Sequence, residues 1–195
     1  MKANELFYID IEELGLSQIY LNQDKLQSIM SWYDPLKIKE YIPLPVRVFR
    51  DNGKYTLTDG HTRAYFLYKN GVKQIPVRID EDEIVTCNLG RKLYQEYIGW
   101  CDRFSINNIK DLEHRIVSDT DYKYLWIERC DRLYQLITAL EDKTINHNEY
   151  DERKKSGESR GLLLYGASND LSAFYYEDMA GNRWICRDRE FMKES

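Results

Sequence analysis

A short stretch of this chain combines the side chains and the backbone freedom needed to bind a phosphate group. It consists of Asp59, Gly60, His61, Thr62 and Arg63. The residues before it alternate in polarity like a half-buried strand, and apolar residues follow it at helical spacing. We therefore predict that a strand ends at Asp59 and that a helix begins near Thr62. Gly60 permits the sharp reversal between them, and Thr62 has the hydroxyl expected of a helix cap.

The chemistry expected of this turn is anion binding. The N–H groups at a helix start and the positive end of the helix dipole favour an anion, and Arg63 adds a planar fork of donors for phosphate oxygens. Asp59 and His61 are predicted at the rim, where they suit a ribose hydroxyl, a metal ion or a substrate proton. The same residues also fit an ordinary loop between a strand and a helix, because short motifs often occur by chance.

The segments around the turn resemble the ParB/sulfiredoxin superfamily. They are, in order, an N-terminal strand, an apolar helix, the strand PLPVRVF, a hairpin turn at Asp51-Asn52-Gly53, the TDGHTRA turn and the closing strand QIPVRI. The resemblance covers residues 5–80 and continues towards residue 135 with a stand-alone bacterial group labelled ParB-like nuclease. It implies an α+β chain with a ParB/sulfiredoxin-like N-terminal domain, followed by helices and a short C-terminal β-hairpin.

In that superfamily a Gly-x-x-Arg turn holds nucleotide phosphates. The nucleotide is CTP in ParB partition proteins, ATP in sulfiredoxins, and ADP or ATP in the free serine kinases. Gly60 and Arg63 occupy the matching positions, and the DGHTR form is closer to the kinases than to the GERR form typical of ParB. The resemblance implies that residues 59–63 bind ATP or ADP, with CTP as an alternative and Mg²⁺ as a further cofactor.

One position departs from the kinase pattern. Gln18 stands where the free serine kinases have the carboxylate that activates the serine hydroxyl. Glutamine cannot accept a proton, so a kinase of this sequence needs another base. Glu13 and Asp34 are the candidates, because each lies beside a segment expected to border the site, and Asp59 is the next to consider. With His61, these three carboxylates make up the candidate catalytic residues.

Three functions follow from these observations. The first is a kinase, a phosphotransferase that uses a nucleotide to phosphorylate a small hydroxyl compound such as free L-serine. The second is a nucleotide-binding regulator without turnover, whose helical region moves or docks a partner. The third, a nuclease, fits these residues poorly because it requires metal-binding carboxylates and a basic DNA surface. No metal site is predicted, since His114 and His147 have no partner at metal-ligand spacing.

The composition narrows the class of protein. The 195 residues, 43% of them hydrophobic, suffice for one compact core or for a domain with a smaller appendage. No apolar run reaches the ~20 residues that span a bilayer, and the start MKANELFYID lacks the apolar block of a signal peptide. We therefore expect a cytoplasmic protein with no membrane partner and with its four widely spaced cysteines as buried thiols. The net charge of -5 disfavours double-stranded DNA as a partner.

The chain is expected to divide into four consecutive parts. These are a nucleotide-binding domain over 1–83, a helical region packed on it over 84–145, a linker or mobile loop over 146–160, and a small β-hairpin appendage over 161–195. Within the second part, helical spacing covers 88–104, 108–117 and 120–142.

Two other groups of charged residues, outside the turn, are expected to be structural. The acidic run 80–83 is interpreted as a solvated turn, with Mg²⁺ binding as the alternative. Arg129 or Arg103 could meet a substrate carboxylate, but an ion pair with Asp102, Glu128 or Asp131 is the simpler explanation.

Overall fold

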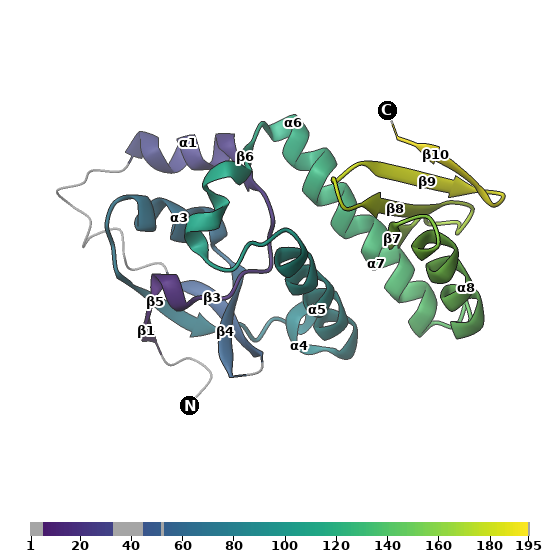
Figure 1. Ribbon diagram of the computed structural model, residues 1–195. Coiled ribbons are helices and arrows are strands. Elements are labelled where there is room, and N and C mark those ends of the chain that lie inside the picture. Colours follow the sequence, from purple (N-terminus) through teal and green to yellow (C-terminus); the bar gives the residue numbers. More distant parts are fainter. Residues whose placement is uncertain (1–5, 33–44, 52, 195) are drawn as a thin grey trace. The chain divides into compact units, whose positions relative to one another are not determined.

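The computed structural model describes residues 6–32, 45–51 and 53–194, and it has the α+β class expected from the sequence (Figure 1). The chain forms two compact units, Met1–Trp126 and Ile127–Ser195. None of the helices in the described ranges combines the length and the apolar character that crossing a membrane requires.

A four-stranded sheet organises the first unit, with the strand order β1-β5-β3-β4. Strands β3 and β5 are parallel, and the other neighbours are antiparallel. Several valine, isoleucine and leucine side chains of these strands are fully buried, among them Val48, Leu57 and Ile75. The strands are β1 (Phe7–Asp10), β3 (Val46–Asp51), β4 (Lys54–Asp59) and β5 (Gln74–Ile79).

Helical segments make up most of the rest of this unit. A parallel two-residue pairing joins β2 (Leu21–Asn22) to β6 (Ile116–Val117), so the last two residues of the helix expected over 108–117 are instead a strand. The helices are η1 (Ile11–Glu13), α1 (Gln23–Trp32), α3 (His61–Lys69), α4 (Glu83–Thr86), α5 (Asn88–Arg103), the 3-10 helix η3 (Ile109–Arg115), and α6 (Asp119–Tyr122), which runs into a π-helical turn, η4 (Lys123–Ile127).

The loop after η1 is held against β4 by backbone hydrogen bonds. Gly15 N donates to Tyr55 O at 2.8 Å, and Leu57 N donates to Gly15 O at 2.9 Å. A Cβ on Gly15 would lie 2.4 Å from Thr56 Oγ1, so a side chain does not fit there. Thr56 is therefore buried, although the alternation of β4 predicts it on the same face as the partly exposed Thr58.

The acidic run 80–83 is only partly solvated. Asp80 is buried, accepts a 2.5 Å hydrogen bond from Thr58 Oγ1 and a 3.1 Å bond from Asp82 N, and lies 3.5 Å from Arg47 Nη1. Arg47 also pairs with Asp82. These bonds compensate for the loss of water around the Asp80 carboxylate. The predicted solvated turn is therefore wrong at Asp80. The described residues contain no cluster of three or more side chains able to hold a metal ion.

An antiparallel four-stranded sheet and two helices form the second unit (Figure 1). The prediction of a small hairpin appendage over 161–195 is wrong, because the strands make a full meander with its own core. That core includes Leu136, Ile145, Phe174 and Tyr176. The elements are α7 (Glu128–Glu141), α8 (His147–Glu158), β7 (Leu162–Ala167), β8 (Phe174–Asp178), β9 (Arg183–Arg187) and β10 (Glu190–Lys193).

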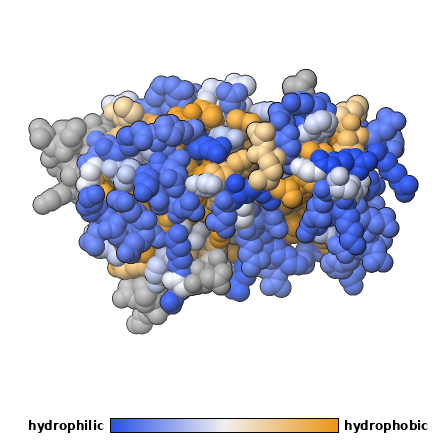
Figure 2. All heavy atoms as spheres, in the orientation of Figure 1, coloured by the Kyte–Doolittle hydropathy of each residue, from blue (hydrophilic) through white to orange (hydrophobic). Residues whose placement is uncertain are grey.

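The predicted linker over 146–160 is instead mostly the helix α8. The Asn146 side chain caps it by accepting from Glu149 N at 2.9 Å. Gly157 lets the helix approach β8 closely, since a Cβ there would lie 2.6 Å from the Tyr176 ring. The surface over α8 is hydrophilic (Figure 2). The many polar residues of this exposed helix are the reason why its sequence predicted a linker.

Arg129 and Glu177 form a buried ion pair in the second unit. Arg129 Nη1 and Nη2 lie 2.7 Å from the two oxygens of Glu177, and both side chains are almost fully buried. The partner therefore comes from β8 rather than from the nearby carboxylates that the sequence suggests. Two parallel charge-assisted bonds offset the desolvation of both charges.

Candidate functional site

The turn between β4 and α3 has the predicted order of elements. Strand β4 ends at Asp59, Gly60 has the left-handed angles φ 96° and ψ 17°, and α3 begins at His61. A Cβ on Gly60 would lie 2.7 Å from Val46 Cγ1, so neither the backbone angle nor the space admits a side chain. Gly60 itself is the N-cap residue, and no side chain caps the helix. The prediction that Thr62 is the cap is wrong, because the cap position is Gly60, two residues earlier.

All five residues of the turn line one hollow of about 300 Å³. The first hydrogen bond inside the helix runs from Ala64 N to Gly60 O at 2.8 Å, so the N–H groups of His61 and Thr62 have no acceptor within α3. The other lining residues are Gln18, Lys25, Ser28, Ile29 and Tyr122.

Arg63 lies beside the glycine on the inner side of the turn. Its Nη2 is 3.6 Å from Asp59 Oδ2, and its Nη1 donates to Pro45 O at 3.5 Å. The Asp59 side chain is 66% exposed and that of Arg63 is 25% exposed. A pair this long and this accessible to water contributes little to stability, so an entering anion could displace Asp59 from Arg63.

His61 is buried and does not lie at the rim as predicted. Its Nε2 accepts a 3.2 Å hydrogen bond from Ser17 N. Burial lowers the pKa of His61 from its usual 6.5 to about 3, so the imidazole is neutral at pH 7. With Nε2 accepting, the proton of the neutral ring is on Nδ1. His61 therefore joins the 15–20 loop to α3, and it supplies no positive charge to the hollow.

The hollow contains Gln18 but not the predicted base Glu13. The Gln18 amide donates from Nε2 to Tyr20 O at 2.6 Å. Glu13 lines a separate hollow together with Tyr8 and Lys54. Asp34 lies outside the described residues. Of the carboxylates predicted as bases, the structure brings Asp59 to the hollow.

Four lining residues were not predicted as site residues from the sequence, namely Lys25, Ser28, Ile29 and Tyr122. The Lys25 ammonium lies 5.5 Å from the centre of the Tyr122 ring. They meet because Asn22 caps α1 by accepting from Lys25 N at 3.0 Å and donates to Asp119 Oδ1, at the start of α6, at 2.8 Å. Asparagine is a common helix cap, but nothing in the sequence connects Asn22 with residue 119.

Comparison with known proteins identifies no family for this chain. No protein-family model matches it, and no curated protein matches it in sequence. Its structure is similar to the crystal structure of protein Atu1540 from Agrobacterium tumefaciens, with 14% sequence identity over 76% of this chain and 84% of that one. The TM-score is 0.33, which supports no inference about fold or function.

We expect Gly60→Ala to destabilise the first unit more than Gly53→Ala does. Both glycines have left-handed angles, so each substitution should lower the free energy of unfolding by about 1–2 kcal/mol. Only Gly60 has Val46 beside it, whereas an added Cβ on Gly53 meets nothing within 4 Å. Urea unfolding of both variants measures these losses. Unfolding of Gly60→Ala combined with Val46→Ala measures how much of the loss at Gly60 is due to the steric contact with Val46. Equal losses in the two single variants would contradict the close packing at Gly60.

We also expect His61 to make stability depend on pH. Between pH 6.5 and 3 the unfolded chain binds a proton at His61 that the folded chain does not. The free energy of unfolding should therefore fall as the pH falls below 6.5, by up to about 1.4 kcal/mol per pH unit from this residue. Urea unfolding from pH 7 to 4.5 should give a shallower slope for His61→Gln than for the parent. His114→Gln, at an exposed histidine, should keep the parent slope.

Proposed function

We propose that this chain is a nucleotide-binding protein of ParB/sulfiredoxin type whose first unit binds the phosphates at the turn 59–63. The observation that carries the proposal is the left-handed Gly60 at the start of α3, with Arg63 beside it and a hollow of about 300 Å³ in front. This volume is at the lower end of small-molecule sites, which suits the phosphates and part of a nucleoside.

The proposed phosphate contacts are backbone N–H groups and two cations. His61 and Thr62 offer N–H donors at the positive end of the α3 dipole. Arg63 offers its guanidinium once Asp59 is displaced, and Lys25 offers an ammonium from the opposite wall. Asp59, released from Arg63, is then available to a ribose hydroxyl or to Mg²⁺. ATP or ADP is the proposed nucleotide, with CTP as the alternative.

Binding without turnover is the function that this hollow supports best. Gln18 lines it and cannot act as a base, and Glu13 lines a different hollow. In this form the protein is a regulator that responds to nucleotide. We also propose a cytoplasmic location, because all four cysteines are free thiols, as is usual in a reducing compartment.

One observation favours a kinase as the second candidate. Asp59 lines the same hollow and is 66% exposed, so it could accept the proton of a small hydroxyl compound such as L-serine. The serine oxygen would then take the terminal phosphoryl group of ATP, leaving ADP. Positioning and charge stabilisation by Arg63 and the helix start would supply most of the catalysis.

Nucleotide binding should depend on Arg63. We expect Arg63→Ala to weaken the binding of the preferred nucleotide by about 1.5–3 kcal/mol, or ten- to a hundredfold, because a charge-assisted fork to phosphate is lost. Isothermal titration with ATP, ADP and CTP measures this. Arg50→Ala, an exposed arginine outside the hollow, should bind like the parent. Equal affinity of Arg63→Ala and the parent for all three nucleotides would refute the site.

Transfer of phosphate to L-serine separates the two candidates. A regulator should bind nucleotide and transfer none, and Gln18→Glu is then the variant in which transfer could appear. A kinase should lose about a hundred- to ten-thousandfold in kcat on Asp59→Asn, with nucleotide affinity largely kept. Glu13→Gln should keep full turnover, and a loss in that variant would restore Glu13 as the base. Phosphoserine formation by the parent and by each of these three variants, measured at saturating nucleotide, gives the turnover needed for the comparison.

A further inference from the structure

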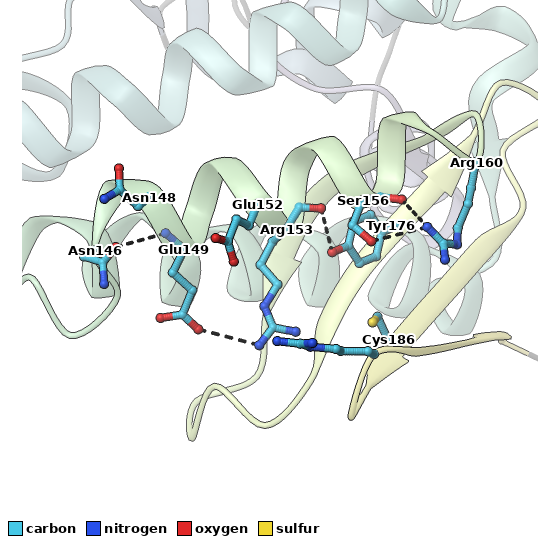
Figure 3. Close-up of a pocket in the computed structure, with 10 residues that line it drawn as sticks. Asn146, Asn148, Glu149, Glu152, Arg153, Ser156, Arg160, Tyr176 and Cys186 are labelled. Atoms are coloured by element: carbon cyan, nitrogen blue, oxygen red, sulfur yellow. Dashed lines mark hydrogen bonds and ion pairs between the residues drawn. The ribbon is translucent and has the colours of Figure 1, made fainter.

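The second unit contains a groove that is separate from the hollow at the Gly60 turn. It has a volume of about 740 Å³ and extends along α8 and the neighbouring strands (Figure 3). Its lining is mostly polar and includes three arginines. The lining residues are Asn146, Asn148, Glu149, Glu152, Arg153, Ser156, Arg160, Tyr176, Cys186 and Arg189.

Two of the arginines are held in place by aromatic rings. The Arg153 guanidinium lies 4.3 Å from the centre of the Phe174 ring, and that of Arg160 lies 4.5 Å from the centre of the Phe191 ring. Figure 3 shows Arg153 projecting from α8 and Arg160 projecting from the turn that follows it. Stacking fixes the plane of a guanidinium and leaves its edge for hydrogen bonds. Two forks are therefore preorganised along the groove.

Arg160 keeps part of its fork for a ligand. Within the described part of the chain, its hydrogen bonds all leave from Nη1, to Ser156 O at 2.8 Å and to the hydroxyls of Ser156 and Ser159. Nη2 and Nε make none of these bonds. A guanidinium has five N–H donors, so the edge formed by Nη2 and Nε can still accept an oxyanion.

The third arginine occupies a strained position in the β9–β10 hairpin. Arg187 pairs with Glu190, which leaves Asp188 and Arg189 as a two-residue loop with φ of 48° and 70°. Glycine is preferred at the second position of such a loop, because a side chain resists positive φ there. Arg189 instead brings a guanidinium to the groove. Strain of this kind is commonly kept where the side chain has a function.

The charges of the groove favour an anion. Three arginines face two carboxylates, Glu149 and Glu152, in a chain whose net charge is -5. Glu149 Oε1 is 3.6 Å from Arg153 Nη2, and both side chains are partly exposed, so this pair is weak and can be displaced. With three arginines and two glutamates, the lining has a net positive charge although the protein as a whole is negative.

We infer that this groove binds a small polyanion through Arg153, Arg160 and Arg189. The ligand has at least two oxyanion groups, because the three forks are carried by different parts of the unit, which are α8, the turn after it and the β9–β10 hairpin. Phosphate and carboxylate oxygens both match a guanidinium fork, and the groove is large enough for an organic molecule that carries either group.

Titration with two probes tests the inference. Pyrophosphate and citrate are titrated calorimetrically into the full chain carrying Arg63→Ala, so that binding at the Gly60 turn is weakened and the variants below assign what remains. Saturable binding of one probe is expected, and the probe that binds tells a phosphorylated from a carboxylated ligand. Absence of binding by both probes to this chain would overturn the inference.

Two further variants locate the binding. In the same background, Arg160→Gln and Arg189→Gly should each weaken binding about tenfold or more. Arg187→Gln, at an exposed arginine of the same hairpin that does not line the groove, should bind as before. Arg189→Gly should also raise the melting temperature, because glycine relieves the positive φ. If Arg189 had no role in binding, Arg189→Gly would raise the melting temperature and leave the affinity unchanged. Unchanged affinity in either Arg160→Gln or Arg189→Gly would overturn the inference.

Discussion

The left-handed backbone at Gly60 is the constraint on which the candidate site of the first unit depends. Val46 fills the space where a side chain would be, so only glycine fits between β4 and α3. Because the reversal is completed in one residue, α3 begins at His61. His61 is then buried against the 15–20 loop, while Arg63 lies beside the glycine. A shift of the helix start by one residue would rotate each of these side chains by about 100° around the helix axis.

The burial of His61 changes which residues can do chemistry in the hollow. A histidine in a short polar motif suggests an acid, a base or a metal ligand. Here its Nε2 accepts from Ser17 N, and its pKa of about 3 keeps it neutral. The charged groups that remain are Asp59, Arg63 and Lys25. Two cations and one carboxylate suit a phosphate better than they suit general acid-base catalysis, which is why nucleotide binding precedes kinase activity in our proposal.

Arginine has two different uses in the second unit. Arg129 is buried with Glu177 in a two-bond pair, so removing either partner would leave a buried charge and destabilise the unit strongly. Arg153 and Arg160 instead lie on aromatic rings at a groove and keep contact with solvent. The first arrangement determines how α7 and β8 meet. The second prepares guanidinium groups for a ligand without requiring a carboxylate partner for each.

The sequence by itself determined the features that depend on neighbouring residues. The end of β4, the glycine reversal and the start of α3 within one residue were all predicted, because strand alternation, helical spacing and positive φ are local properties. Tertiary structure decided what lies opposite the turn. The contacts of His61 with Ser17, and of Lys25 with Tyr122, join residues far apart in the chain, and Gln18 rather than Glu13 reaches the hollow. Tertiary packing also holds the polar segment 147–158 as a helix, since Gly157 lies against the Tyr176 ring. Such contacts depend on how distant segments pack. The spacing of residues within one segment does not predict that packing.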